Sequence, residues 1–347
     1  MESFTTNWRP GLIIMLFLSL YTPMVQSQGV TFRYLNPNAT AVFLAGEMNN
    51  WSPAATPMTK DASGQWTVTL DLAPGQWLYK FVVDGKFISD PDPDALSTPD
   101  GQGGMHSYLL VGEGDYRYHL QIPHGTVESY NFQSSFLGLG VDVNVYIPPV
   151  TSTDSLPVLI LLHGSGMDKQ QWTDNGQIAN YMDNLLAKRM VKPFIIAMPS
   201  YMPYSQSEDL AGFLTWDLPG FLKYKFSSSV DPKKLALGGM SLGGWITLRV
   251  GADNPRNFGS LFPISADVPM NAKEISDLAG LKKAGKLIVF CGTDDPLLKN
   301  NEYLAGWLTR NRIPFDYIKA SGGHTWQYWN LITPDFLMKV SGLFPGK

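Results

Sequence analysis

Short hydrophobic runs separated by turn residues characterise the first third of the chain. Between about Gly29 and Gly112, no segment has the periodicity of a helix, and turns rich in Asn, Asp, Pro and Gly follow one another closely. The apolar or alternating runs are Val30–Tyr34, Ala41–Leu44, Trp66–Leu72, Trp77–Val83 and Tyr108–Val111. This pattern predicts a small all-β, immunoglobulin-like sandwich domain over residues 28–113.

The pattern changes after about residue 122, where strand-like runs alternate with segments long enough for helices. The predicted strands are Asp142–Ile147, Val158–Leu162, Phe194–Met198, Lys234–Leu237, Leu261–Ser265, Lys286–Cys291 and Phe315–Lys319. The predicted helices are Gln177–Arg189, Leu210–Phe226, Leu242–Ala252 and Asn300–Arg312. This alternation predicts a doubly wound α/β domain over residues 125–347, joined to the sandwich by a linker at 114–124.

The N-terminal residues have the organisation of an export signal. Arg9 precedes the apolar run Gly11–Leu20, and Val25-Gln26-Ser27 provides a small residue at a cleavage site. A bilayer-spanning helix needs about 20 apolar residues, so an uncleaved anchor is the weaker alternative. We therefore predict a signal peptide at 1–27 and a secreted or periplasmic protein that does not bind a membrane once the signal is removed.

Charge and the content of cysteine and histidine disfavour several classes of function. The net charge is −4, and Lys and Arg do not cluster as they would on a surface that binds nucleic acid. The single cysteine, Cys291, ends an apolar run and is expected to be a buried hydrophobic residue, without an internal disulfide partner. The five histidines are scattered and form no metal-binding motif, so neither a metal nor a cofactor is expected.

The motif Gly239-Met240-Ser241-Leu242-Gly243 is the main indication of chemistry. It follows the apolar run Leu235–Leu237 and begins a helical segment, the context in which G-x-S-x-G displays a nucleophilic serine above a sheet. Glycines on both sides of Ser241 avoid a Cβ clash in such a tight turn. We therefore predict an α/β-hydrolase domain with Ser241 as its nucleophile.

Chain order identifies the base and narrows the acid. In this fold the acid and then the histidine follow the serine, and His324 is the only histidine after Ser241. Among the acids after Ser241, Asp294 and Asp295 lie in the loop that leaves a predicted buried strand. A carboxylate there can accept the imidazole Nδ1–H and stabilise the imidazolium. Spacing does not separate Asp294 from Asp295.

The oxyanion formed during acyl transfer needs two preorganised N–H donors. One is expected from Leu242, directly after the nucleophile, and the other from the turn at 163–166, after a predicted strand. A simple loop turn is the alternative for this second segment. The presumed cleft is rich in tryptophan, and we expect Trp326, Trp329 and Trp172 to contact substrate, whereas core packing is at least as good an interpretation for Trp216.

The catalytic part of the chain resembles the esterase D-like group, carbohydrate esterase family 1, which includes feruloyl and acetylxylan esterases and relatives of enterochelin esterase. The matching segments are Val145–Pro149, Leu161–Gly164, Gly238–Gly244, Gly292–Asp295 and Gly322–His324 with Trp326. The resemblance implies that Asp295 is the acid and that Ser165 provides the second oxyanion donor.

The first domain is similar to carbohydrate-binding module family 48, the glycogen-binding type. The matching segments are Phe43–Trp51, Gly75–Gly85 and Asp90–Asp92. The resemblance places the ligand-contacting aromatic and basic positions on Trp51 and Lys80. Phe87 replaces a tryptophan and His106 an asparagine of the glucan binders, so a structural module beside the active site is an equal alternative to a sugar-binding one.

Together these features predict a secreted serine esterase that acts through an acyl-serine intermediate on an ester-substituted polysaccharide or oligosaccharide. Feruloyl or acetyl groups on plant cell-wall xylan are the first expectation. A siderophore-type or other small-ester esterase, and a carbohydrate-binding protein with an inactive hydrolase domain, are the alternatives. The sequence does not define the oligomeric state.

Overall fold

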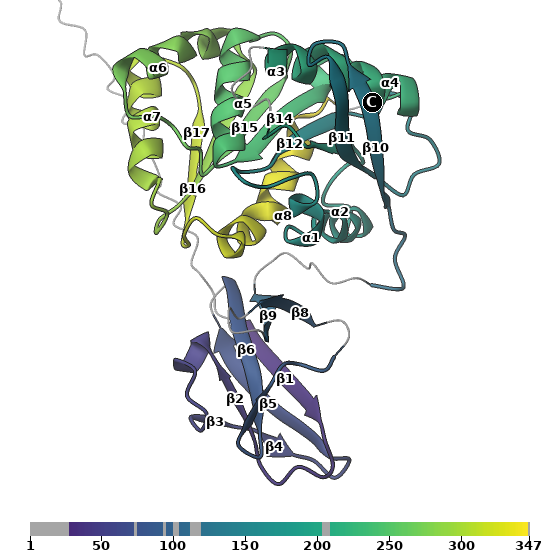
Figure 1. Ribbon diagram of the computed structural model, residues 1–347, viewed down its shortest axis with the longest axis vertical. Helices are drawn as coiled ribbons and strands as arrows, with labels where there is room; N and C mark the ends of the chain where they lie inside the picture. Colours follow the sequence, from purple (N-terminus) through teal and green to yellow (C-terminus); the bar gives the residue numbers. More distant parts are fainter. Residues whose placement is uncertain are drawn as a thin grey trace, which may run out of the picture.

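A computed structural model describes residues 28–72, 75–92, 95–99, 104–111, 119–202 and 209–345. Figure 1 shows two bodies, a small β-sandwich and a larger α/β domain with helices around a central sheet. The predicted signal peptide and residues 112–118 of the domain junction lie outside the described residues. No helix in the described part of the chain is both long and apolar enough to span a bilayer.

The sandwich consists of two antiparallel sheets. One sheet has the order β1-β5-β4 and the other β3-β2-β6-β9-β8, with β7 paired to β6. Apolar side chains between the sheets, among them Phe32, Leu44 and Phe81, form the core, as alternation of inward and outward residues requires. The strands are β1 (Gln28–Leu35), β2 (Val42–Gly46), β3 (Thr56–Pro57), β4 (Thr59–Lys60), β5 (Gln65–Leu72), β6 (Gly75–Val83), β7 (Lys86–Ile88), β8 (Leu96–Pro99) and β9 (Met105–Val111). The predicted all-β domain is confirmed.

The larger domain is built on a mixed sheet with the order β10-β11-β13-β12-β14-β15-β16-β17 within the described residues. The pairs β10–β11 and β11–β13 are antiparallel, and every pair from β13–β12 onward is parallel. The strands are β10 (Thr126–Ser134), β11 (Leu139–Ile147), β12 (Val158–Leu162), β13 (Ile195–Pro199), β14 (Leu235–Met240), β15 (Ser260–Ile264), β16 (Lys286–Gly292) and β17 (Asp316–Ala320). The predicted doubly wound α/β architecture is confirmed, with an antiparallel hairpin at one edge.

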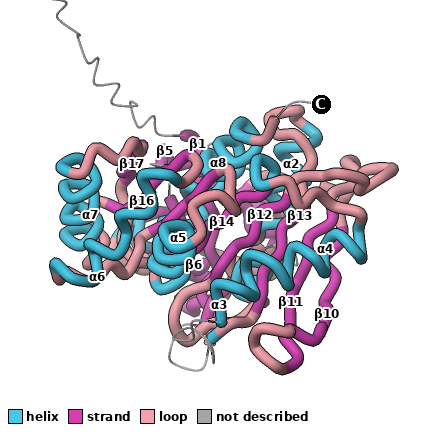
Figure 2. The backbone as a smooth tube through the Cα atoms, turned by 90° about the horizontal axis from the view of Figure 1, so that it is seen from above, coloured by secondary structure: helices cyan, strands magenta, loops and turns pink. Residues whose placement is uncertain are grey.

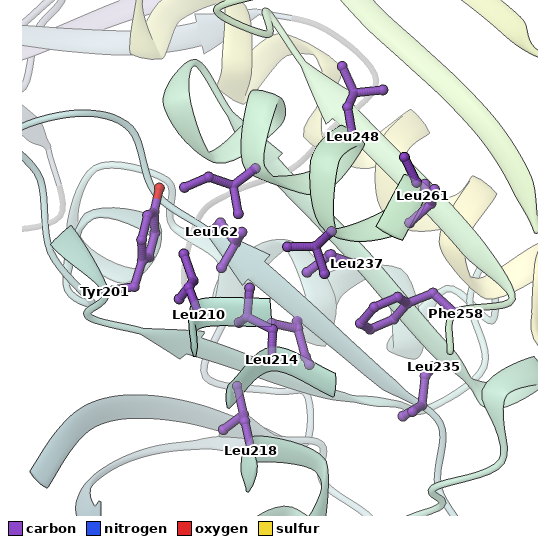
Figure 3. Close-up of a cluster of buried hydrophobic side chains, with 14 of the residues drawn as sticks. Leu162, Tyr201, Leu210, Leu214, Leu218, Leu235, Leu237, Leu248, Phe258 and Leu261 are labelled. Carbon is purple, nitrogen blue, oxygen red and sulfur yellow. The ribbon is translucent and has the colours of Figure 1, made fainter. Parts of the chain in front are cut away.

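Alternate residues of the central strands face two separate hydrophobic cores. On β12, Val158, Ile160 and Leu162 belong to one core, and Leu159 and Leu161 belong to the other. A strand covered on both faces must be apolar at every position, which explains its uninterrupted hydrophobic sequence. Figure 2 shows α3 to α6 on one face of the sheet and α2 and α8 on the other. Figure 3 shows leucines of β12, β14 and β15 packed against leucines of α3 to α5.

Several helices differ from expectation, and the short ones at Gln171–Asp174 and Ala272–Ser276 were not predicted. The segment predicted as one helix at 210–226 is divided by a π-helical turn at Phe213–Asp217, and the long C-terminal helix was not predicted. The helices are α1 (Gln171–Asp174), α2 (Ile178–Ala187), α3 (Asp209–Gly212), α4 (Leu218–Phe226), α5 (Leu242–Asp253), α6 (Ala272–Ser276), α7 (Leu298–Arg310) and α8 (Trp326–Leu343).

Helix α8 tolerates an internal proline because the carbonyl that Pro334 leaves without a helical donor has another partner. Pro334 has no N–H, so it cannot bond to the carbonyl of Asn330 four residues earlier. The Tyr181 hydroxyl of α2 donates to that carbonyl at 3.1 Å. The hydrogen bond compensates for the missing helical bond and joins α8 to α2.

The sandwich contacts the larger domain at α8. Strands β6 and β9 lie against this helix, and Leu96 and Leu110 of the sandwich pack against the hydrophobic core beneath it. Figure 1 shows the upper end of β6 close to α8. The module therefore supports the helix whose first turn borders the candidate site described next.

Candidate active site

Ser241 lies on a sharp turn between β14 and α5. Its backbone dihedrals, φ 56° and ψ −119°, are those of a strained turn that few non-glycine residues adopt. A Cβ at Gly239 would lie 2.7 Å from the Gly243 backbone, and one at Gly243 would lie 2.5 Å from the His163 carbonyl oxygen. Glycine is therefore required at both positions, as the motif predicted.

The structure brings Ser241, His324 and Asp295 together. His324 Nε2 is 3.0 Å from the Ser241 Oγ, and His324 Nδ1 is 3.0 Å from the Asp295 Oδ2. An ionised carboxylate can only accept a hydrogen bond, so His324 Nδ1 bears the proton. Nε2 is then left as an acceptor for the Ser241 hydroxyl. This arrangement matches a nucleophile, a base and an orienting acid.

Geometry separates the two neighbouring aspartates. The Asp295 side chain is fully buried beneath His324. Asp294 is exposed, and its carboxylate accepts the N–H of Gly322 at 3.2 Å. Asp294 thus braces the loop before His324, whereas Asp295 contacts the imidazole itself. The structure places Asp295 in the position that the family resemblance implied.

Asp295 is held in its charged form despite its burial. Burial alone would raise the pKa of this carboxyl, but hydrogen bonds from His324, Ser265 and the backbone N–H of Leu297 outweigh it and lower the pKa below its ordinary value. The Leu297 bond is 2.8 Å long. The site therefore contains a fixed negative charge that can stabilise a protonated His324 at neutral pH.

Two backbone segments can supply oxyanion donors. Leu242 is the first residue of α5, and the first N–H groups of a helix have no acceptor within it. The carbonyl of Gly164 accepts from His163 Nδ1 at 2.8 Å and from the Met167 N–H at 3.3 Å. The Gly164 carbonyl and the Ser165 N–H belong to the same planar peptide and point in opposite directions. The two hydrogen bonds to that carbonyl therefore also fix the Ser165 N–H, which points away from His163 Nδ1 and from the Met167 N–H.

The neighbourhood of this turn contains two groups that sequence analysis missed. His163 is buried, which lowers its pKa and keeps it neutral. Its ring stacks on Tyr201 with centroids 4.5 Å apart, and the Tyr201 hydroxyl donates to the His163 carbonyl. No spacing rule in the sequence relates His163 to Tyr201, because His163 follows strand β12 and Tyr201 follows the neighbouring strand β13.

A cavity of about 390 Å³ opens in front of Ser241. Its walls include Met167 and two tryptophans, Trp326 and Trp329, whose rings meet edge to face at 5.3 Å. The other lining residues are Gly164, Ser165, Ser241, His324 and Thr325. None of the described lining residues is Lys, Arg, Asp or Glu. The cavity thus suits a neutral, flat or apolar group attached to the reacting carbonyl.

The structure contradicts the expectation for Trp172 and rules out core packing, one of the two interpretations left open, for Trp216. Trp172 was expected to contact substrate, but it is buried beneath Trp326 and donates its indole N–H to the Leu162 carbonyl at 3.1 Å. Trp216, for which core packing was considered, is 64% exposed on the π-helical turn. Neither residue lines the cavity. Cys291 is fully buried, as expected.

Trp51 and Lys80, the predicted sugar contacts, lie in the sandwich and not at the cavity. Trp51 adopts φ 59°, and its ring packs on His106 with centroids 4.4 Å apart. Phe87 is 49% exposed. Part of the Trp51 surface is therefore occupied by a protein ring, and sugar binding at this position remains a prediction.

Comparison with known sequences agrees with the two-domain description. Residues 134–334, more than half of the chain, match the family described as "Putative esterase". Residues 20–99 match carbohydrate-binding module 48, the isoamylase N-terminal domain. The chain is similar to an endo-1,4-β-xylanase/feruloyl esterase of Xylanibacter ruminicola, with 28% identity over 291 residues. That match covers 78% of this chain and 39% of the relative.

Solved structures with the same fold include a ferulic acid esterase of Anaeromyces mucronatus and an enterobactin esterase of Shigella flexneri. The first has a TM-score of 0.60 and 16% identity, and covers 68% of this chain and 97% of its own. The second has a TM-score of 0.59 and 15% identity, and covers 91% of this chain and 96% of its own. At these identities the likeness establishes the fold.

Proposed function

Because the chain belongs to the esterase family whose sequence model covers residues 134–334, we propose that it is a serine esterase that cleaves carboxylic esters through an acyl-serine intermediate. The observation that supports this most strongly is the continuous hydrogen-bonded series from Ser241 through His324 to Asp295. The fold, the family and the geometry of the turn agree with one another. No cofactor is needed for this chemistry.

The proposed reaction uses each group of the site in turn. His324 Nε2 takes the Ser241 proton while Oγ attacks the ester carbonyl, and the N–H groups of Leu242 and Ser165 stabilise the oxyanion. The imidazolium, stabilised by Asp295, then protonates the leaving alcohol, and the acyl group stays on Ser241. Water, deprotonated by the same Nε2, attacks the acyl carbon, and the imidazolium returns this proton to Ser241 Oγ as the C–Oγ bond breaks and the acid is released.

We propose that the acyl group is aromatic, with a feruloyl group on plant cell-wall xylan as the first choice. Trp326 and Trp329 offer edges and faces to a planar ring, and the cavity is much larger than an acetyl group requires. The similarity to a xylanase/feruloyl esterase supports this substrate class. We further propose that the protein is exported, on the basis of the signal-like residues 1–27.

A catecholate siderophore ester is the second candidate. It is favoured by one observation, namely that the enterobactin esterase fold covers both domains of this chain. Against it, the described residues that line the cavity include no Lys or Arg, although a polyanionic iron–catecholate complex would call for positive charge. Assays of feruloylated arabinoxylan beside a catecholate trilactone distinguish the two substrates.

Acyl-group selectivity tests the proposed role of the cavity. Trp326→Ala should lower kcat/KM for methyl ferulate about 10- to 30-fold and that for p-nitrophenyl acetate about threefold or less, because only the aromatic acyl group loses a stacking partner. Steady-state kinetics on both esters would measure this ratio. Trp216→Ala is the matched control, since Trp216 is exposed and does not line the cavity. Equal losses on both esters in Trp326→Ala would contradict an aromatic acyl site.

A further inference from the structure

The turn at 163–166 lies directly against the nucleophile. A Cβ built on Gly164 would lie 3.4 Å from the Ser241 Cβ, which is an ordinary contact distance. Gly164 and Ser165 also line the cavity in front of Ser241. Because the turn and the nucleophile are in contact, a small displacement of the turn changes where the Ser165 N–H points relative to the reacting carbonyl.

Two consecutive peptide groups of this turn are fixed by hydrogen bonds. The His163 carbonyl accepts from the Tyr201 hydroxyl. The next carbonyl, that of Gly164, accepts from His163 Nδ1 at 2.8 Å and from the Met167 N–H at 3.3 Å. A peptide group is planar, so each of these bonds also fixes the N–H on the opposite side. The second peptide is the one that contains the Ser165 N–H.

Tyr201 contacts His163 a second time, through its ring. The two rings are stacked, with centroids 4.5 Å apart and planes 27° from parallel. A carbonyl only accepts, so His163 Nδ1 is the donor to Gly164, and Nε2 has no hydrogen-bond partner among the described residues. The imidazole is thus oriented by one hydrogen bond and by the face of Tyr201. Tyr201 therefore holds both the backbone and the side chain of the residue that begins the turn.

Tyr201 is itself firmly placed. It is fully buried and belongs to the same hydrophobic core as Leu162 and Leu210 (Figure 3). The residue before it, Ser200, donates its N–H to the Asp142 carbonyl of β11 at 2.8 Å, so the pairing of β13 continues up to the tyrosine. Burial raises the pKa of the Tyr201 phenol, so the hydroxyl keeps the proton that it donates.

We propose that Tyr201 is a positioning residue for the oxyanion site: its hydroxyl and its ring hold His163, and His163 in turn holds the peptide that presents the Ser165 N–H. The inference rests on the proposed serine esterase function. Tyr201 does not line the cavity, so it acts through the turn and not on the ester. Stabilisation of the oxyanion then depends on a side chain that follows the neighbouring strand β13.

Tyr201→Phe tests this role in the full-length protein, because it removes the hydroxyl and keeps the ring. We expect kcat for p-nitrophenyl acetate to fall about tenfold with KM changed by less than about twofold, since the displaced donor stabilises the oxyanion and not the bound ester.

Phenylboronic acid provides a readout that a merely structural defect would not move. Its boron bonds to Ser241 Oγ and becomes tetrahedral and anionic while the serine proton passes to His324, so the adduct mimics the oxyanion. We expect its inhibition constant to rise in Tyr201→Phe by about the same factor as kcat falls. A smaller amount of folded enzyme would lower the rate and leave this constant unchanged.

His163→Leu provides a second, independent variant, since it removes the Nδ1 donor and the stacked ring and leaves the carbonyl that Tyr201 binds. We expect kcat to fall about 10- to 30-fold, with weaker inhibition by the boronic acid. In the double variant, the loss should be smaller than the product of the two single losses, because both residues hold one turn. Losses that multiply would contradict an action of Tyr201 through His163.

Tyr181→Phe is the matched control. Tyr181 is also buried, and its hydroxyl also donates to a backbone carbonyl, that of Asn330 at 3.1 Å. The same kind of hydrogen bond is therefore lost at a position that does not line the cavity. We expect thermal stability to fall as in Tyr201→Phe, whereas kcat and the inhibition constant should stay within about twofold of wild type.

The outcomes separate this inference from the proposed function. A wild-type protein that neither hydrolyses esters nor reacts with a fluorophosphonate would disprove the esterase. An active wild type, with Tyr201→Phe folded by circular dichroism and the boronic acid inhibition constant unchanged, would overturn the positioning role whatever the value of kcat. If Tyr201→Phe does not fold, an unchanged inhibition constant in His163→Leu would overturn it equally.

Discussion

Replacement of Ser241 by alanine is expected to lower kcat for ester hydrolysis about 10⁴- to 10⁶-fold, because among the described residues no other hydroxyl is placed against His324 Nε2. The change removes one oxygen atom from a partly exposed side chain. The free energy of unfolding should therefore stay within about 0.5 kcal/mol of the wild-type value. Initial rates with p-nitrophenyl acetate, together with thermal unfolding, would measure the two quantities on one preparation.

Ser200→Ala is the control for this variant. Ser200 directly follows β13, at the same end of the parallel strands as Ser241. Its hydroxyl accepts the Lys169 N–H at 3.1 Å. It does not line the cavity, so activity should remain within about threefold of wild type. More than one per cent residual activity in Ser241→Ala, free of contaminating wild-type enzyme, would show that another group attacks the ester.

Asp295→Asn should cost about 10³- to 10⁴-fold in kcat, since an amide at this position can support the wrong imidazole tautomer and cannot stabilise the imidazolium. Both Asp295 oxygens lie within 3.1 Å of His324 Nδ1. The substitution is nearly isosteric, so the expected loss is electrostatic and not steric. It would be measured as kcat for p-nitrophenyl acetate across the pH range in which the protein is folded.

Asp294→Asn is the natural comparison, because the two aspartates are adjacent and the substitution is identical. Asp294 accepts the Gly322 N–H, and an asparagine oxygen can retain that bond. We expect its kcat to stay within about fivefold of wild type. A large loss in Asp294→Asn with a small one in Asp295→Asn would reverse the assignment of the acid.

The sequence pattern predicted the central strands, which are buried on both faces, and missed, among other elements, strand β10 and helix α8. Strand β12 is apolar throughout because helices cover both its faces. Strand β10 at the sheet edge was missed, because most of its side chains are exposed and its sequence lacks a hydrophobic pattern. Helix α8 was missed because Pro334 interrupts it, and only the distant Tyr181 hydroxyl makes that proline acceptable.

Some residues of the site could be identified from local sequence, and others only from contacts with residues far away along the chain. A local motif and chain order were sufficient to select Ser241 and His324. Spacing left Asp294 and Asp295 equivalent, and burial beneath the imidazole separates them. The stacking of His163 on Tyr201 could not be found from sequence, because the two residues follow different strands and are far apart along the chain. Trp172 was misassigned because the sequence does not show which of the tryptophan rings expected near the site reaches the cavity.

The most direct measurement of the central claim is covalent labelling of the full-length protein with a fluorophosphonate, followed by intact mass and peptide mapping. The account predicts a single adduct on Ser241, formed at neutral pH in the wild type and absent from Ser241→Ala, and slowed strongly in a His324→Ala variant. A wild-type protein that stays unmodified, or an adduct mapped to another residue, would contradict the claim that His324 activates Ser241.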